Sequence, residues 1–267
     1  MAEPNTRLAS LLLRCAAPLS GLRRIPVLGD LLSWTSRKLV PRELLIWVRI
    51  QSGAANNLWI RVNPRTGQNA QKGMGEPEVQ RALADHLQPG MTFYDLGANI
   101  GFFSLMAARL VGPQGRVFSF EADPEIAARL RENLSRNQFT HAQVVQKAVW
   151  SETSTVSFAR VDPATSPDRG LGHVSANGSA ASSITVEAVS LDQFVASNPA
   201  PDFVKCDVEG AEVAVFQGAA NLLSSRRPIF LVEMHSPENQ RALLEKFSGA
   251  GYRCRRLDET HVLALPQ

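Results

Sequence analysis

From about residue 90 onward, short apolar runs alternate with segments whose apolar residues lie three and four positions apart, the patterns of strands and of amphipathic helices. Strands are predicted at 91–98, 115–122, 142–150, 154–160, 202–208 and 228–235, helices at 101–111, 124–137, 211–225 and 237–251, and a closing hairpin at 252–258 with 261–266. Alternating strands and helices build a parallel sheet covered on both faces. We therefore expect a doubly wound α/β sheet of about seven strands with an antiparallel C-terminal edge.

Residues 1–70 have a different pattern and are predicted to form an N-terminal extension, mainly amphipathic helices and a short strand region, before one domain at 71–267. Residues 1–65 hold ten Lys or Arg against three acids. Leucines recur at helical spacing within 8–40, although Pro18 should interrupt a helix there. We favour helices packed on the main domain, and peripheral contact with a membrane surface is the alternative.

Length and composition limit the class of protein. The chain has 267 residues, 44% of them hydrophobic, which is enough for a full-sized core. No stretch reaches the roughly 18 unbroken apolar residues of a membrane-spanning helix. The three cysteines are widely spaced, so a disulfide framework or zinc site is not expected and a cytoplasmic location fits best. Residues 161–183, rich in Pro, Gly and Ser, predict a long loop.

The stretch "YDLGANIGFFSL" lies at the first strand-to-helix turn, where an open α/β sheet places its ligand. Gly97 and Gly101 allow a sharp turn, and Glu121, 20 residues after Gly101, ends the next strand, where an acid can bind ribose hydroxyls. Asn99 replaces the second glycine of a dinucleotide fingerprint, and Asp95 would repel a pyrophosphate. A cofactor with a sulfonium and an ammonium, S-adenosylmethionine, suits this turn better than NAD.

Four blocks together resemble the FkbM-type S-adenosylmethionine-dependent methyltransferases: "YDLGANIGFFSL", "FEADPE", "VKCDVEGAEVAVFQGA" and "LVEMH". The resemblance runs from about Gly75 to near the C-terminus. It implies a class I methyltransferase sheet in strand order 3-2-1-4-5-7-6, with the cofactor across strands 1, 2 and 4. It also implies methyl transfer, usually to a hydroxyl oxygen of a sugar, polyketide or other product of secondary metabolism.

Carried onto this sequence, the resemblance implies seven cofactor-binding residues. Glu121 is expected to bind the ribose hydroxyls, and Asp123 and Ala148 to line the adenine site. The seven residues are Asp95, Gly97, Asn99, Gly101, Glu121, Asp123 and Ala148.

Ionisable residues in two neighbouring predicted strands are the candidates for catalysis. Lys205 and Asp207 share one strand face by period-2 alternation, as do Glu233 and His235 in the next strand. We expect Lys205 and Glu233 to form a structural ion pair. His235 is expected to be the general base, with Asp207 orienting it or holding the acceptor hydroxyl, and a packed histidine at the strand end is the alternative. A divalent metal on Asp207, Glu233 and His235 stays open but is not favoured.

Three further acids have simpler interpretations. Glu209 and Glu212 begin a helix, where carboxylates favour the positive end of the helix dipole. Glu76, beside Pro77, is interpreted as a helix-start residue, with reach toward the substrate as the alternative.

The alternatives to a small hydroxylated acceptor come from several classes. Nucleic acid is not expected as a partner, because the catalytic half is net acidic and lacks a basic groove. Methylation of a peptide or protein amide nitrogen stays open, since the same sheet supports it. A non-catalytic cofactor-binding scaffold, anchored to membranes through residues 8–40, is the alternative outside enzymes.

Overall fold

The computed structural model describes residues 44–160, 172–174, 183–225 and 227–267. The predicted helices within residues 8–40 and most of the predicted loop at 161–183 lie outside this part of the chain. No helix of the described part is both long and apolar enough to cross a membrane. Contact with a membrane surface and a cytoplasmic location therefore stay predictions.

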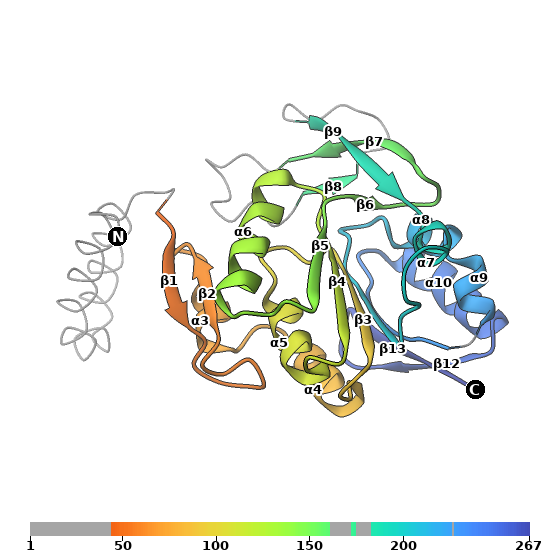
Figure 1. The fold of residues 1–267 in the computed structure, drawn as a ribbon. Coiled ribbons are helices and arrows are strands. Elements are labelled where there is room, and N and C mark those ends of the chain that lie inside the picture. Colours follow the sequence, from red (N-terminus) through yellow and green to blue (C-terminus); the bar gives the residue numbers. More distant parts are fainter. Residues whose placement is uncertain (1–43, 161–171, 175–182, 226) are drawn as a thin grey trace, which may run out of the picture.

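A seven-stranded sheet forms the centre of the molecule, in the order β12-β13-β11-β10-β3-β4-β5 (Figure 1). Numbered along the chain within this sheet, the order is 3-2-1-4-5-7-6, as the resemblance implies. All neighbours are parallel except β13, which is antiparallel to both β11 and β12. The strands are β3 (Thr92–Leu96), β4 (Arg116–Phe120), β5 (Ala142–Val145), β10 (Phe203–Cys206), β11 (Ile229–Glu233), β12 (Tyr252–Arg256) and β13 (His261–Pro266).

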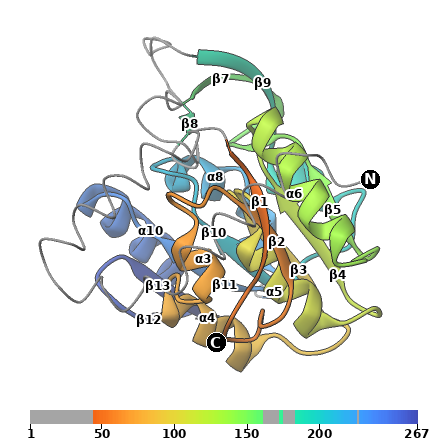
Figure 2. The ribbon, with the colours of Figure 1, turned by 90° about the vertical axis from the view of Figure 1, so that its left-hand side faces the viewer.

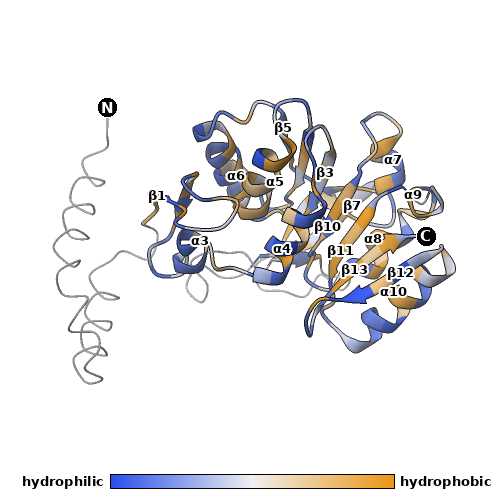
Figure 3. Ribbon diagram, turned by 90° about the horizontal axis from the view of Figure 1, so that it is seen from below, coloured by the Kyte–Doolittle hydropathy of each residue, from blue (hydrophilic) through white to orange (hydrophobic). Residues whose placement is uncertain are grey.

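Helices cover both faces of this sheet, which confirms the class I methyltransferase architecture (Figure 1). Successive strand residues face opposite layers, so Phe93 packs in one hydrophobic cluster and Tyr94 in the other. One layer holds α4 (Pro77–His86), α5 (Phe102–Val111) and α6 (Pro124–Arg136). The other holds α7 (Leu191–Val195), α8 (Glu212–Gln217), α9 (Ala220–Ser224) and α10 (Pro237–Gly249). Most residues of β11 and β13 are hydrophobic (Figure 3).

A smaller sheet, in the order β6-β9-β7-β8, lies beside the main one and was not expected as a separate unit. Its strands are β6 (Ala148–Val149), β7 (Ser154–Ala159), β8 (His173–Val174) and β9 (Ser183–Val189). The predicted strand 142–150 divides into β5 and β6, because the Lys147 N–H donates to the Val145 carbonyl in a tight turn (2.9 Å). Strand β6 then pairs with β9 instead of continuing beside β4.

The predicted helix 211–225 likewise divides into α8 and α9 at Gly218. The Gly218 carbonyl accepts the N–H of Asp192 (3.0 Å), and a side chain at Gly218 would meet the Trp150 carbonyl. The close approach of these segments ends α8.

The segment before α4 holds the hairpin β1 (Ile46–Arg49) and β2 (Trp59–Val62) and the short helix α3 (Gln68–Lys72). The hairpin lies along α6 (Figure 2). Asn133 and Asn137 of α6 accept the backbone N–H groups of Arg61 and Trp59, each at 2.8 Å. Ile60 belongs to the same hydrophobic cluster as Phe93. The hairpin is thus packed against the sheet domain, and a boundary at residue 70 stays a prediction.

Cys206 and Cys254 are both free. The third cysteine, Cys15, lies outside the described residues.

Candidate active site

The loop between β3 and α5 forms one wall of the site. The N–H groups of Gly97 and Ala98 donate to the Phe120 carbonyl at the end of β4 (3.1 and 2.9 Å), which holds the loop against the neighbouring strand. Gly97 has φ +74°, and a side chain there would overlap the Asp207 carbonyl. Asn99 is also left-handed, with φ +50°. Glycine is therefore required at position 97 because two loops approach each other closely there.

Glu121 lies at the end of β4 beside this loop. Its two carboxylate oxygens accept the backbone N–H groups of Asn99 (2.9 Å) and Asp123 (2.8 Å). Burial raises the pKa of Glu121 to about 7, although both hydrogen bonds oppose that change. Because its side chain also lines the cavity described below, the geometry fits a carboxylate that accepts ribose hydroxyls.

Asp95 and Gly101, two predicted cofactor residues, are not among the residues that line the cavity. Asp95 is fully buried, accepts a hydrogen bond from Ser104 (2.6 Å) and lies 3.6 Å from the Lys205 ammonium. Burial raises the pKa of Asp95, against the lowering effects of Lys205 and Ser104. At Gly101, with φ +89°, a side chain would overlap Leu130. Asp95 and Gly101 therefore support the conformation of the turn without lining the cavity.

Asp123 and Ala148, the predicted adenine-side residues, occupy different environments. Asp123 caps the N-terminus of α6 by accepting the N–H of Glu125 (2.8 Å). Its carboxylate also accepts hydrogen bonds from Nε and a terminal nitrogen of Arg160, at 2.7 and 3.1 Å. Asp123 is therefore occupied by helix and arginine contacts, whereas Ala148 lines the cavity.

A single cavity of about 520 Å³ connects the turn to the ionisable residues of β10 and β11. Its nucleoside end is formed by the turn, the end of β4 and the small sheet. Its other end, the acidic end, holds Glu76, Asp207, Glu209 and Glu233. The nucleoside-end residues include Gly97, Asn99, Phe120, Glu121, Ala122, Ile126, Ala148, Val149, Phe158 and Val174.

The acidic end contains a buried lysine whose partners differ from the prediction. The Lys205 ammonium lies 3.1 Å from Asp207 Oδ2 and 3.6 Å from Asp95 Oδ1. The predicted ion pair of Lys205 with Glu233 is wrong, because the neighbouring strand β3 places Asp95 directly opposite Lys205 in the sheet. Burial opposes ionisation of Asp207, but the Lys205 charge outweighs it and lowers the pKa of Asp207. Asp207 Oδ1 is buried and makes no hydrogen bond.

His235 lies just beyond the end of β11, between three carboxylates. Its Nδ1 is 2.7 Å from Glu212, and its Nε2 is 3.4 Å from Glu209 and 3.7 Å from Asp207. The hydrogen bond to Glu212 raises the pKa of His235 to about 9, despite partial burial. The imidazole is therefore protonated at neutral pH. The sequence argument that an ordinary pKa suits His235 for proton abstraction does not hold in this environment.

Glu212 is a residue whose importance the sequence did not reveal. It is fully buried, and besides His235 it accepts the Gly210 N–H and the Asn239 side-chain amide, both at 2.8 Å. Its position at the start of α8 agrees with the helix-start interpretation, but its main partners are side chains from other elements. Full burial and side-chain partners from other elements distinguish Glu212 from an acid that only caps a helix, and the sequence shows neither.

Glu76 lies at the start of α4, as interpreted, but its side chain does not cap the helix. Its backbone is left-handed (φ +44°), and its side chain makes no capping hydrogen bond. The carboxylate instead lines the cavity and lies 3.4 Å from Nε2 of His261. The sequence pattern predicts His261 only as the first residue of a hairpin strand, so its place beside the site could not be foreseen.

Carboxylates and histidines are close enough here for a metal ion. Asp207, Glu233 and His235, the set left open above, each offer a ligand atom, and these atoms lie within 4.8 Å of one another. Burial, followed by the charge of Asp207, raises the pKa of Glu233 to about 7. An acid that resists ionisation in this way is stabilised as a carboxylate by a neighbouring cation.

Comparison with known proteins gives a family match. The model of the methyltransferase FkbM domain matches residues 95–254. The chain is similar to the hexuronic acid methyltransferase AglP of Haloferax volcanii, with 32% identity over 164 residues, 61% of this chain and 63% of that protein. It is also similar to an arsenite methyltransferase of Halobacterium salinarum, with 40% identity over 65 residues, 24% of this chain and 16% of that protein.

Among solved structures, the chain is similar to the methyltransferase FkbM from Methylobacillus flagellatus KT. The identity is 19% and the TM-score 0.47, over 66% of this chain and 43% of that one. The chain spans less than two thirds of the length of each of these three proteins.

Proposed function

This chain belongs to the FkbM methyltransferase family. On that premise we propose that it transfers a methyl group from S-adenosylmethionine to a hydroxyl oxygen of a small hydroxylated metabolite, a sugar in the first instance. The observation that carries the proposal is the single cavity that joins the Gly97–Asn99–Glu121 end to the acidic end. A cofactor and an acceptor can therefore meet in one cavity.

The residues at the nucleoside end fit the cofactor. Glu121 is ionised above a pH of about 7 and can accept hydrogen bonds from ribose hydroxyls, and Gly97 brings the backbone of the turn to the cavity wall without a side chain. Asp207 and Glu209 supply negative charge where the cavity passes to the acidic end. The cofactor supplies a methyl group on a sulfonium, which is already a strong leaving group.

Asp207 is the residue that we propose to hold the acceptor hydroxyl. It lines the cavity, and its side chain is 20% exposed, so the carboxylate can accept a hydrogen bond from the substrate. The proton on the acceptor oxygen becomes strongly acidic as the new C–O bond forms. A carboxylate of lowered pKa is therefore a sufficient acceptor, and positioning supplies most of the rate.

His235 completes the proposed catalytic pair, in a role different from that of a base. As an imidazolium held by Glu212, it places a positive charge 3.7 Å from Asp207 and 3.4 Å from Glu209. Together with Lys205 it lowers the pKa of Asp207 and so favours the ionised form of that carboxylate.

The choice of a sugar acceptor rests on the name of the hexuronic acid methyltransferase relative and on the acidic end. Carboxylates only accept hydrogen bonds, and a polyhydroxylated ring offers several donors to Glu76, Asp207 and Glu233. The same relative suggests hexuronic acids as the first acceptors to test.

The test begins with calorimetric titration of the full chain with S-adenosylhomocysteine, using NADH as the comparison ligand. Transfer of labelled methyl from S-adenosylmethionine is then measured with a panel of sugars, hexuronic acids and peptides. We expect micromolar binding of S-adenosylhomocysteine alone and label in a hydroxylated acceptor.

Label in the peptides alone would favour an amide-directed enzyme and contradict the hydroxyl proposal. Binding of S-adenosylhomocysteine without transfer to any acceptor would favour the scaffold alternative. Binding of NADH alone would contradict the assignment of the cofactor.

A further inference from the structure

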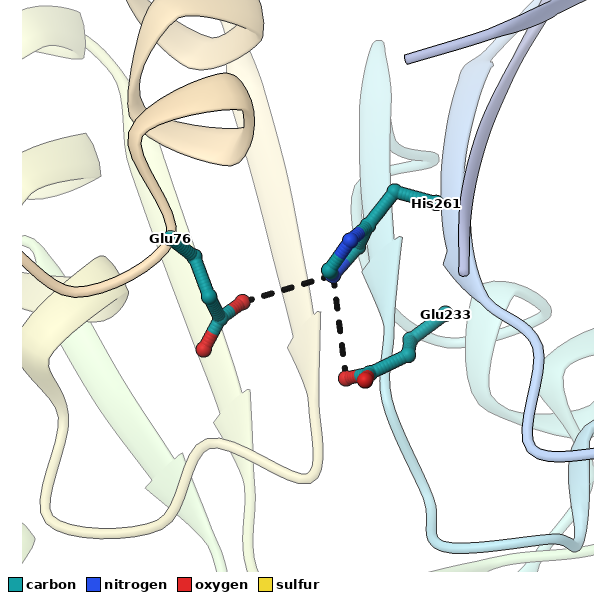
Figure 4. A group of neighbouring side chains, drawn as sticks. All are labelled: Glu76, Glu233 and His261. Carbon is teal, nitrogen blue, oxygen red and sulfur yellow. Dashed lines mark ion pairs between the residues drawn. The ribbon is translucent and has the colours of Figure 1, made fainter. Parts of the chain in front are cut away.

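Three residues from distant parts of the chain meet beside the acidic end of the cavity (Figure 4). Glu76 precedes α4, Glu233 ends β11 and His261 begins β13. His261 stands directly opposite Glu233 in the antiparallel β11–β13 ladder, so the sheet itself brings these two together. Nε2 of His261 lies 3.4 Å from Glu76 Oε2 and 3.7 Å from Glu233 Oε2.

The two nitrogens of His261 have different surroundings. Nδ1 lies 2.9 and 3.0 Å from the two carboxylate oxygens of Asp258, close enough to donate a hydrogen bond to them. Nε2 is buried and makes no hydrogen bond, in a side chain that is 7% exposed. A hydrogen-bonded Nδ1–H leaves a lone pair on Nε2 of a neutral imidazole, and that lone pair is directed between two carboxylates.

We propose that Glu76, Glu233 and His261 form a binding site for a divalent metal cation. One ligand atom from each residue lies within 4.8 Å of the other two. Ligands placed about 2.0–2.2 Å from one metal ion are separated from one another by about 3 to 4 Å. The distances from Nε2 of His261 to Glu76 and Glu233, 3.4 and 3.7 Å, already lie in that range.

Asp258 strengthens this assignment, because histidines that bind metals usually donate their other N–H to a carboxylate. That contact selects the tautomer and fixes the plane of the ring. Two carboxylates and one imidazole suit a divalent cation that accepts both oxygen and nitrogen ligands. We choose Mn²⁺ as the probe.

The competing occupant of the cluster is a proton. Burial opposes the protonation of His261, but the neighbouring carboxylates outweigh burial and raise its pKa. A His261 imidazolium would pair with Glu76 and Glu233 without any metal. Since the metal and the proton compete for the same Nε2 lone pair, direct detection of a metal–nitrogen bond separates them.

The position of the site suggests a purpose, which rests on the proposed function. Glu76 and Glu233 both line the cavity, whereas His261 approaches from behind them. A cation held there would direct its open coordination positions toward the acceptor. It could bind two adjacent oxygens of a sugar or a uronate, and it would offset the repulsion between a uronate and the acidic end.

The test uses the full chain, stripped with a chelator and titrated with Mn²⁺ without cofactor or acceptor. Electron paramagnetic resonance measures the free Mn²⁺, and electron spin echo modulation detects a coordinated imidazole nitrogen. We expect one Mn²⁺ per chain with nitrogen coupling. Glu76→Gln and His261→Gln should each lower the affinity at least about tenfold, and His261→Gln should abolish the coupling.

His235→Gln is the matched control, because it removes the histidine of the other possible set, Asp207, Glu233 and His235. It should keep both the affinity and the coupling. S-adenosylhomocysteine binding and thermal unfolding check the fold of each variant. If His261→Gln does not fold, Glu76→Gln still tests the site, since Glu76 is 40% exposed and lies at the surface of the cluster.

The proposal would be overturned if the stripped chain bound no Mn²⁺ at millimolar concentration. It would equally be overturned if His235→Gln, and not His261→Gln, abolished the nitrogen coupling. Measuring methyl transfer with and without chelator separates the two proposals. Methyl transfer by a chain that binds no Mn²⁺ would contradict the metal site alone. Mn²⁺ binding without methyl transfer would contradict the proposed function alone.

Discussion

Oε1 of Glu212 lies 2.7 Å from Nδ1 of His235, and Glu212 has no exposed surface. This contact joins the start of α8 to the end of β11 and fixes the ring beside Asp207. A buried carboxylate with three donors is costly to disturb, because each donor would lose its partner. The pair therefore links the stability of the domain to the shape of the acidic end.

Glu212→Ala should lower the free energy of unfolding by about 2 kcal/mol, because it leaves the Gly210 N–H, the Asn239 amide and the partly exposed His235 ring without their shared acceptor. Urea denaturation followed by circular dichroism measures this change. Glu209→Ala is the control, since Glu209 is only partly buried and lies farther from the ring, at 3.4 Å. Equal effects of the two substitutions would contradict a special role for Glu212.

Affinity for S-adenosylhomocysteine should depend on pH through Glu121. Its pKa is raised to about 7 in the free protein, and ribose hydroxyls favour the ionised carboxylate. Affinity is therefore highest above pH 7 and should fall up to about tenfold for each unit of pH below it. Calorimetric titrations between about pH 5.5 and 8.5 measure this dependence.

Glu121→Gln should bind about tenfold more weakly at pH 8 and lose the dependence. Glu152→Gln, at an exposed acid outside the cavity lining, should retain it. A pH dependence that persists in Glu121→Gln would assign the titration to another group.

Asp207→Asn should lower the rate of methyl transfer by about 10² or more, because the amide can no longer take the proton of the acceptor. The Lys205 ammonium keeps Asp95 as a partner, so the domain should still fold. Affinity for S-adenosylhomocysteine should change much less than the rate. Single-turnover measurements with labelled cofactor separate the two, and an unchanged rate would remove Asp207 from the chemistry.

Arg160 connects the end of β7 to the start of α6 through Asp123 and Glu125, at 2.7 and 2.8 Å. Because β7 belongs to the small sheet that lines the nucleoside end, Arg160→Ala should weaken S-adenosylhomocysteine binding several-fold. Arg160→Lys should recover little, since one ammonium cannot reproduce the two-pronged contact. Full recovery by lysine would show that charge alone is sufficient.

Gly97→Ala should destabilise the protein more than Gly210→Ala. Both positions have positive φ, +74° and +99°, which costs an alanine about 1 kcal/mol. At Gly97 the added carbon would also overlap the Asp207 carbonyl, whereas at Gly210 it would meet nothing within 4 Å. Thermal unfolding measures the difference, and equal shifts would show that the loops separate easily.

Most of the sheet could be predicted from the sequence because strands and helices follow from local periodicity. The runs at 91–98, 115–122 and 228–235 became β3, β4 and β11, and the hairpin that became β12 and β13 was also predicted. The order of the strands came from the resemblance of four motifs. The breaks at Lys147 and Gly218 were not predictable, since they depend on distant segments: β6 pairs with β9, and the Gly218 carbonyl accepts the N–H of Asp192.

For the site, the sequence alone determined which ionisable residues end β10 and β11 and that the turn after β3 suits a nucleoside. Period-2 alternation and the parallel sheet are sufficient for that. Only the tertiary structure decided that Lys205 pairs with Asp95, that Glu212 holds His235 and that Glu76 meets His261. The reason is physical: the charge and partner of a carboxylate depend on its burial and on distances of a few ångströms, which are set by neighbours far away in the chain.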